Sequence, residues 1–187
     1  MITLVCGPMF AGKTTKIVEI INSHEGQKVL VINYYGDDRE KEEGCVLSTH
    51  NIAILDSISE SLLLTTQIAV KNLFDIKSIT SFDLVVIDEA QFFPDLFDFV
   101  TFWKNKVDFV VSGLDTDYTK SPFGDIPKIE KISQQVIHLR GKCCGKEGTC
   151  PHLSTHTRRK IKESSLEMIG GNDFYEPVCE ECHYIHI

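Results

Sequence analysis

Short unbroken runs of apolar residues alternate with segments of helical spacing through the first 140 residues. The apolar runs predict four strands: Ile2–Val5, Lys28–Tyr34, Asp83–Asp88 and Asp108–Ser112. The helical spacing predicts two helices, Lys13–His24 and Leu96–Lys104. Strands rich in β-branched residues that lack polar alternation are buried on both faces. The pattern therefore predicts an α/β fold with a mostly parallel sheet between helices.

Length and composition narrow the class of protein. The chain has 187 residues, of which 42% are apolar, and no apolar run approaches the length of about 18 residues that a membrane span requires. Its start, MITLVCGPMF, lacks the basic region of a signal peptide, so we expect a cytoplasmic protein that does not engage membranes. The net charge of −8 disfavours non-specific binding to nucleic acid.

The charge and the cysteine content of the chain both change near residue 140. Residues 140–162 carry seven Lys or Arg residues against one Glu, so this segment has a charge of +6 while the rest has −14. Five of the seven cysteines lie in the last 45 residues, and cysteines without a secretion signal read as thiols or metal ligands. We therefore predict a body at 1–139 and a small metal-stapled element at 140–187.

A phosphate-binding motif follows the first predicted strand. The segment GPMFAGKT fits the pattern G-x-x-x-x-G-K-[ST] of a P-loop, in which backbone N–H groups at a helix start surround phosphates. Lys13 would bridge the β- and γ-phosphates, and the Thr14 hydroxyl would bind Mg²⁺. The loop comprises Gly7, Pro8, Met9, Phe10, Ala11, Gly12, Lys13 and Thr14.

An acidic pair ends the third predicted strand. In the sequence DEAQ, Asp88 would provide the second magnesium anchor of a P-loop protein, and Glu89 would serve as a general base or position the attacking group. The same four letters occur in helicase motors, but these need a second lobe and a basic track for the strand. A chain of this length and charge favours a small-molecule kinase.

Four ordered motifs resemble the type II thymidine kinase family: GPMFAGKTT, VIDEAQFF, GLDTDYTKSPFG and MIGGNDFYEPVCEEC. The resemblance spans essentially the whole chain. It implies a P-loop core, transfer of the ATP γ-phosphoryl group to the 5′-hydroxyl of thymidine with Mg²⁺, and a homotetramer or homodimer. It also implies that Glu89 is the catalytic base, that Asp37, Arg39 and Gln91 lie on the nucleotide side, and that Gln91 helps to close the site around the nucleoside.

The resemblance also implies a nucleoside pocket. Phe92 would help to close it, and Tyr118 stands where the family has an aromatic residue that stacks near the base, with Phe123 as a second one. A loop that follows the metal element, the lasso, would form the remaining wall. Its residues here are Leu166, Glu167, Met168, Ile169, Gly170 and Tyr175.

The cysteines near the end of the chain predict a structural zinc site. Cys179 and Cys182 have the spacing of a tetrahedral half-site. In the family, the other half of the site is also C-x-x-C. Here the segment is longer, which four extra residues between the two ligands would explain. On this account Cys143 and Cys150 are the ligands, because both keep the family's distances to the neighbouring motifs. Cys144 and His152 are rival ligands.

Two alternative functions stay open at this point. One is a related kinase whose preference has shifted to deoxyuridine or another pyrimidine nucleoside. The other is a binding protein that senses nucleotides through its P-loop and zinc ribbon. The set of Lys13, Thr14, Asp88 and Glu89 disfavours the sensor, which has no need of a catalytic base.

Overall fold

A computed structural model gives the fold and describes residues 1–35, 65–145, 148–160 and 174–184. Among these residues, six strands form one sheet in the order β3-β2-β4-β5-β1-β6, and every neighbouring pair is parallel. The strands are β1 (Ile2–Cys6), β2 (Val29–Tyr34), β3 (Thr65–Val70), β4 (Leu84–Ile87), β5 (Asp108–Gly113) and β6 (Gln135–His138). The predicted parallel α/β fold is confirmed.

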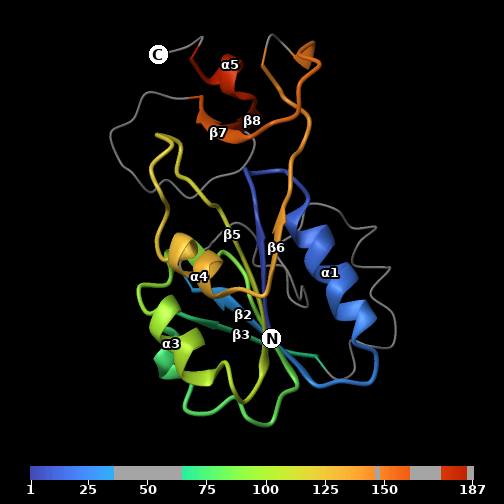
Figure 1. Cartoon of the computed structure of the whole chain (residues 1–187), viewed down its shortest axis with the longest axis vertical. Helices are drawn as coiled ribbons and strands as arrows, with labels where there is room; N and C mark the ends of the chain where they lie inside the picture. Colours follow the sequence, from blue (N-terminus) through green and yellow to red (C-terminus); the bar gives the residue numbers. More distant parts are fainter. Residues whose placement is uncertain (36–64, 146–147, 161–173, 185–187) are drawn as a thin grey trace.

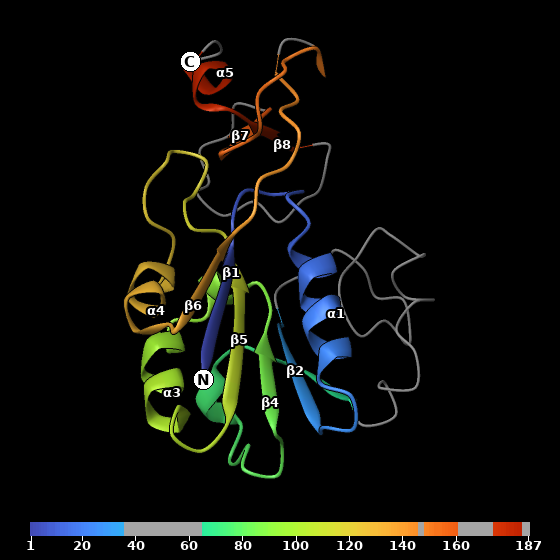
Figure 2. The same cartoon turned by 45° about the vertical axis from the view of Figure 1, so that its right-hand side comes forward.

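Helices cover both faces of this sheet (Figures 1 and 2). On one face lies α1 (Lys13–Ser23), which buries Ile17, Val18 and Ile21 against alternate residues of the strands. On the other face lie α3 (Leu96–Trp103) and α4 (Ile126–Ile132), which pack on a larger apolar cluster. Because each central strand is buried on both sides, its sequence shows no polar alternation.

Both predicted helices exist, and each ends one residue earlier than expected. His24 takes a non-helical conformation and its N–H donates to the Ile21 carbonyl, so α1 ends at Ser23. Two strands, β3 and β6, and the helix α4 were not predicted. The edge strands are partly exposed, and α4 is only seven residues long with a proline in its first turn.

The C-terminal part forms a separate small sheet above the carboxyl ends of the large one (Figure 2). Strands β7 (His156–Arg159) and β8 (Tyr175–Val178) pair antiparallel, and α5 (Glu180–Tyr184) follows. Its buried cluster consists of Val178 and four cysteines. We refer to the described residues after 140 as the cysteine element.

Candidate active site

The loop between β1 and α1 lies at the carboxyl edge of the sheet. At Gly7, which has φ 144°, an added Cβ would lie 2.3 Å from the Leu139 carbonyl oxygen, so a side chain would not fit. Gly12 takes a left-handed conformation and α1 begins at the next residue. Lys13 Nζ donates to the carbonyl oxygens of Gly7 at 3.2 Å and Pro8 at 2.9 Å. The loop thus has the shape and the cation of a phosphate site.

The acidic pair follows β4 at the same edge. Asp88 is buried, and burial followed by the charge of Glu89 raises the pKa of its carboxyl to about 6. Its Oδ1 accepts a hydrogen bond from the Glu89 N–H at 3.0 Å. Glu89 has φ 49° and ψ 41°, a left-handed conformation that non-glycine residues adopt at a cost of roughly 1–3 kcal/mol, most often at functional sites. A divalent cation would relieve the charge buried at Asp88.

Gln91 connects this pair to the end of β5. It belongs to the short helix η3 (Ala90–Phe92) and is 4% exposed. Its Nε2 donates to Glu89 Oε2 at 2.7 Å, and its Oε1 accepts from the backbone N–H of Leu114 at 3.0 Å. Both ends of the amide therefore bind protein groups in this structure.

A hairpin of residues 115–124, which we call the Tyr118 hairpin, follows β5. The buried Asp117 carboxylate accepts hydrogen bonds from the N–H groups of Thr119 at 2.8 Å and Ser121 at 3.0 Å, which fixes its turn. At its base, the Phe123 ring packs edge-on against Phe92, with centroids 5.5 Å apart. These hydrogen bonds hold the backbone around Tyr118 in a defined turn.

The cysteine element contacts both the P-loop and the Tyr118 hairpin. Thr157 Oγ1 accepts a hydrogen bond from the Met9 N–H at 3.0 Å. The Arg159 guanidinium lies 4.0 Å from the centre of the Tyr118 ring and donates to the Tyr175 hydroxyl at 2.8 Å. These contacts join three segments that are distant in sequence into one site.

Further contacts tie the end of α5 to the same hairpin. His183, which was not predicted to have a role, donates from Nε2 to the Tyr118 carbonyl oxygen at 3.0 Å. Lys120 forms an ion pair with Glu180 at 2.7 Å and lies 3.8 Å from the centre of the Tyr184 ring. Hydrogen bonds from Lys120, Tyr184 and His156 lower the pKa of Glu180 to about 2. The hairpin is therefore held by several polar contacts at once.

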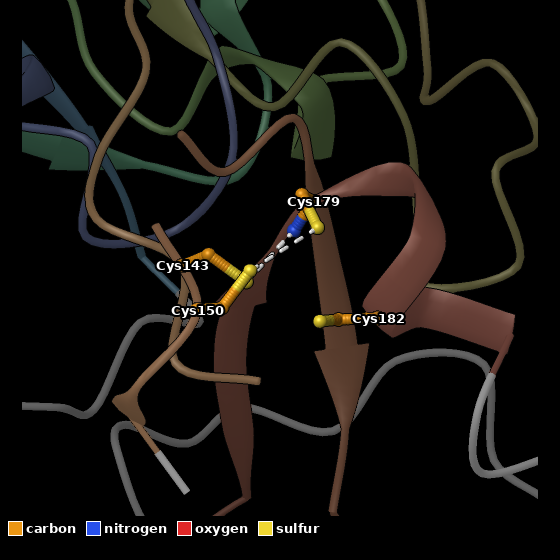
Figure 3. Close-up of side chains that lie close together, drawn as sticks. All are labelled: Cys143, Cys150, Cys179 and Cys182. Carbon is orange, nitrogen blue, oxygen red and sulfur yellow. Dashed lines mark hydrogen bonds between the residues drawn. The ribbon is translucent and has the colours of Figure 1, made fainter. Parts of the chain in front are cut away.

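Four buried cysteines converge in the cysteine element (Figure 3). The sulfurs of Cys143, Cys150, Cys179 and Cys182 all lie within 4.8 Å of one another. Those of Cys150 and Cys179 are 3.8 Å apart, which matches the edge of about 3.8 Å in a tetrahedron of zinc–sulfur bonds of about 2.3 Å. The donor set and its spacing therefore fit a structural zinc ion, and these are the four cysteines predicted from the sequence.

Backbone groups support the same four ligands. The N–H groups of Cys179 and Gly145 donate to Cys143 Sγ at 3.2 and 3.3 Å. Burial raises the pKa of the Cys143 thiol, but these two donors together with hydrogen bonds from the Cys150 and Cys179 thiols hold its pKa below the ordinary value. An added Cβ on Gly145 would lie 2.4 Å from Cys182 Sγ, so the Gly at this turn was a signal that sequence reasoning missed. The rivals Cys144 and His152 are both exposed and lie outside this group.

The predicted site residues divide into three groups. The P-loop, the acidic pair and Gln91 lie together at the carboxyl edge of the sheet. Phe92 packs against Phe123, and the Arg159 guanidinium contacts the rings of Tyr118 and Tyr175. Asp37 and Arg39 lie outside the described residues, as do Leu166, Glu167, Met168, Ile169 and Gly170. The contacts of Thr157, Arg159 and His183 were not predicted.

Comparison with known proteins identifies the family. A family model described as thymidine kinase matches residues 1–183. The chain belongs to the thymidine kinase family. This confirms the resemblance seen in the four motifs and the predicted class of enzyme, an ATP-dependent kinase.

Relatives of this thymidine kinase family member include several poxvirus proteins. The thymidine kinase of vaccinia virus (strain Ankara) is 32% identical over 187 residues, which cover 97% of this chain and 96% of the vaccinia chain. That of raccoon poxvirus is 33% identical, with the same shares covered. The thymidine kinase of sheeppox virus (strain KS-1) is 30% identical over 98% of this chain and 97% of its own.

A solved structure, the flagellar accessory protein FlaH from Methanocaldococcus jannaschii, aligns with a TM-score of 0.47 at 11% identity. It covers 73% of this chain and 70% of its own, a similarity too low to add to the family assignment. Among the described residues of this thymidine kinase family member, no helix has the length and apolar character needed to cross a membrane.

Proposed function

We propose that the protein transfers the γ-phosphoryl group of ATP to the 5′-hydroxyl of thymidine and forms thymidine monophosphate. The observation that carries this proposal is the meeting of the P-loop, the acidic pair and the Tyr118 hairpin at one edge of one sheet. Membership of the thymidine kinase family supports the choice of nucleoside. Neither a shifted base preference nor a sensor role gains support from the geometry.

The nucleotide side of the site consists of the P-loop and α1. Backbone N–H groups at the start of α1 would hold the phosphates, and Lys13 would exchange its loop carbonyls for phosphate oxygens. Thr14 and Asp88 would hold Mg²⁺, which supplies charge neutralisation at the phosphates when bound. Asp37 and Arg39 are proposed as further nucleotide contacts from the family motif.

The nucleoside side lies beneath the Tyr118 hairpin. Glu89 would accept the proton of the 5′-hydroxyl, since phosphoryl transfer needs positioning and one base. Tyr118, Phe123 and Phe92 would pack around the nucleoside, with Tyr175 on the side of the cysteine element. The family resemblance assigns residues 166–170, which lie outside the described residues, to the same pocket.

Three further points remain predictions. Zinc at the four cysteines would be structural, because four protein ligands leave no open position. A homotetramer or homodimer and a cytoplasmic location follow from the family resemblance and from the cysteine usage. Light scattering on the purified protein tests the oligomer.

The test is phosphate transfer from labelled ATP to each deoxynucleoside, with and without Mg²⁺. We expect thymidine to be the best acceptor, and Glu89→Gln to lower kcat by about 10²–10⁴-fold while ATP and thymidine still bind. A different preferred nucleoside, or a Glu89→Gln rate above half that of the wild type, would contradict the proposal.

A further inference from the structure

The orientation of the Gln91 amide is settled by its neighbours. The backbone N–H of Leu114 can only donate, so the atom that it contacts at 3.0 Å is the amide oxygen. The opposite end of the amide is therefore the NH₂ group, which lies 2.7 Å from Glu89 Oε2. Gln91 thus donates to the carboxylate that would act as the base, and a hydrogen bond to a charged acceptor is stronger than one between neutral groups.

Close packing fixes Gln91 itself. An added Cβ on Gly113 would lie 2.6 Å from Gln91 Oε1, and one on Gly124 would lie 2.3 Å from the Gln91 carbonyl oxygen. Gly113 and Leu114 precede the Tyr118 hairpin, and Gly124 ends it. Gln91 therefore contacts both ends of the arm that carries Tyr118, while its amide holds Glu89.

We propose that Gln91 is a positioning residue. It orients the Glu89 carboxylate toward the nucleoside hydroxyl and holds that carboxylate in a fixed position relative to the Tyr118 hairpin. The proposal rests on the proposed function of Glu89 as base. A catalytic group has to be held within about 0.5 Å of its productive geometry by neighbouring side chains, and the hydrogen bond from the Gln91 amide holds the Glu89 carboxylate in this way. Gln91 then acts through Glu89 and not on ATP or Mg²⁺, which differs from the nucleotide-side position that the family resemblance implies.

The kinetic test uses Gln91→Met, which keeps the volume and removes both amide contacts. Misplacement of a catalytic group by about 1 Å lowers rates by up to about 10²-fold, so we expect kcat to fall by about 10–10²-fold. The KM for ATP should stay within about twofold, because no nucleotide contact is lost. Urea unfolding of Gln91→Met, with a midpoint close to that of the wild type, checks that any loss of rate is not a failure to fold.

A double-mutant cycle separates positioning from a general structural effect. In a Glu89→Gln background there is no carboxylate to aim, so Gln91→Met should lower kcat by less than about twofold further. The matched control is Gln67→Met, at an exposed glutamine of β3, which should leave kcat and KM near the wild type. A full multiplicative loss in the Glu89→Gln background would overturn the proposal, as would a raised KM for ATP with unchanged kcat.

A spectroscopic test keeps this proposal separate from the proposed function. The side-chain NH₂ signal of Gln91, identified by its absence in Gln91→Met, should have one proton shifted downfield and protected from exchange, and Glu89→Ala should abolish both effects. Lack of that signature would refute the contact whatever the substrate. If the signature is present but the wild type does not phosphorylate thymidine, the proposed function fails and the contact stands.

Discussion

Replacement of Asp88 by asparagine should stabilise the ligand-free protein while it removes activity. The Asp88 carboxyl is 6% exposed, and burial, followed by the charge of Glu89, raises its pKa from 3.8 to about 6. In the unfolded chain its pKa returns to about 3.9. The folded state therefore binds this proton more tightly, and stability falls as the pH rises from about 4 to about 6. Asparagine has no such charge to bury.

The pKa shift sets the size of the effect. A shift of about two units corresponds to about 3 kcal/mol, which is the full gain expected of Asp88→Asn at pH 8. At pH 4 the wild-type carboxyl is protonated in the folded state and about half ionised in the unfolded state, so the gain should shrink to about 0.5 kcal/mol. The asparagine oxygen can still accept the Glu89 N–H, so that bond does not offset the gain. Since Glu89 contributes to the shift, Glu89→Gln should recover part of the same energy, and the two gains should not add.

Urea unfolding between pH 5 and pH 8, followed by the fluorescence of Trp103, the single tryptophan of the chain, measures this difference. Zinc is kept present and Mg²⁺ and nucleotides are left out. Glu25→Gln removes a charge at an exposed position and is the control, with an expected change within about 0.5 kcal/mol. Equal stabilities of Asp88→Asn and wild type at pH 8, or a gain that does not grow from pH 5 to pH 8, would refute the reasoning. Added Mg-ATP should stabilise only the wild type.

Three other substitutions or treatments test the remaining parts of the site. Lys13→Ala should lower both ATP affinity and kcat, measured by nucleotide titration and steady-state rates, because it removes a cation at the β- and γ-phosphates; if both stayed unchanged, the P-loop assignment would be wrong. Cys150→Ser should lose zinc while Cys144→Ser retains it. If metal analysis showed the reverse, Cys144 and not Cys150 would be the ligand. Removal of zinc should raise the KM for thymidine with ATP binding nearly preserved, since the cysteine element contacts the Tyr118 hairpin and the main sheet has its own core.

The strands predicted from sequence are those buried on both faces. β1, β4 and β5 contain apolar runs without polar alternation because helices cover both faces of the sheet, and periodicity detects this. β3 and β6 are edge strands with partly exposed side chains, so their short sequences look no different from loops. The clustering of Cys143, Cys150, Cys179 and Cys182 was predictable because these cysteines keep their distances to the flanking motifs.

The network around Gln91 could not be predicted in the same way. Its partners Leu114 and Gly124 lie 23 and 33 residues further along the chain, and no spacing rule brings them to one amide. The contacts of Thr157 with Met9 and of His183 with Tyr118 have the same origin. Sequence motifs identify the residues that contact ligands. The residues that hold those side chains in position can be identified only from the packing of the folded chain.

The position of β1 between β5 and β6 has a consequence for how the protein is made. Ile2 pairs with Phe109 and Thr3 pairs with Gln135, so the first strand of the chain has no partner strand until over a hundred more residues exist. At a synthesis rate of about 5–20 residues per second, the residues that separate the first strand from its partner strands take about 5–26 s to be synthesised. Such long-range pairing also slows folding. The phosphate loop is translated among the first residues, yet it is among the last parts of the nascent protein to take its final shape.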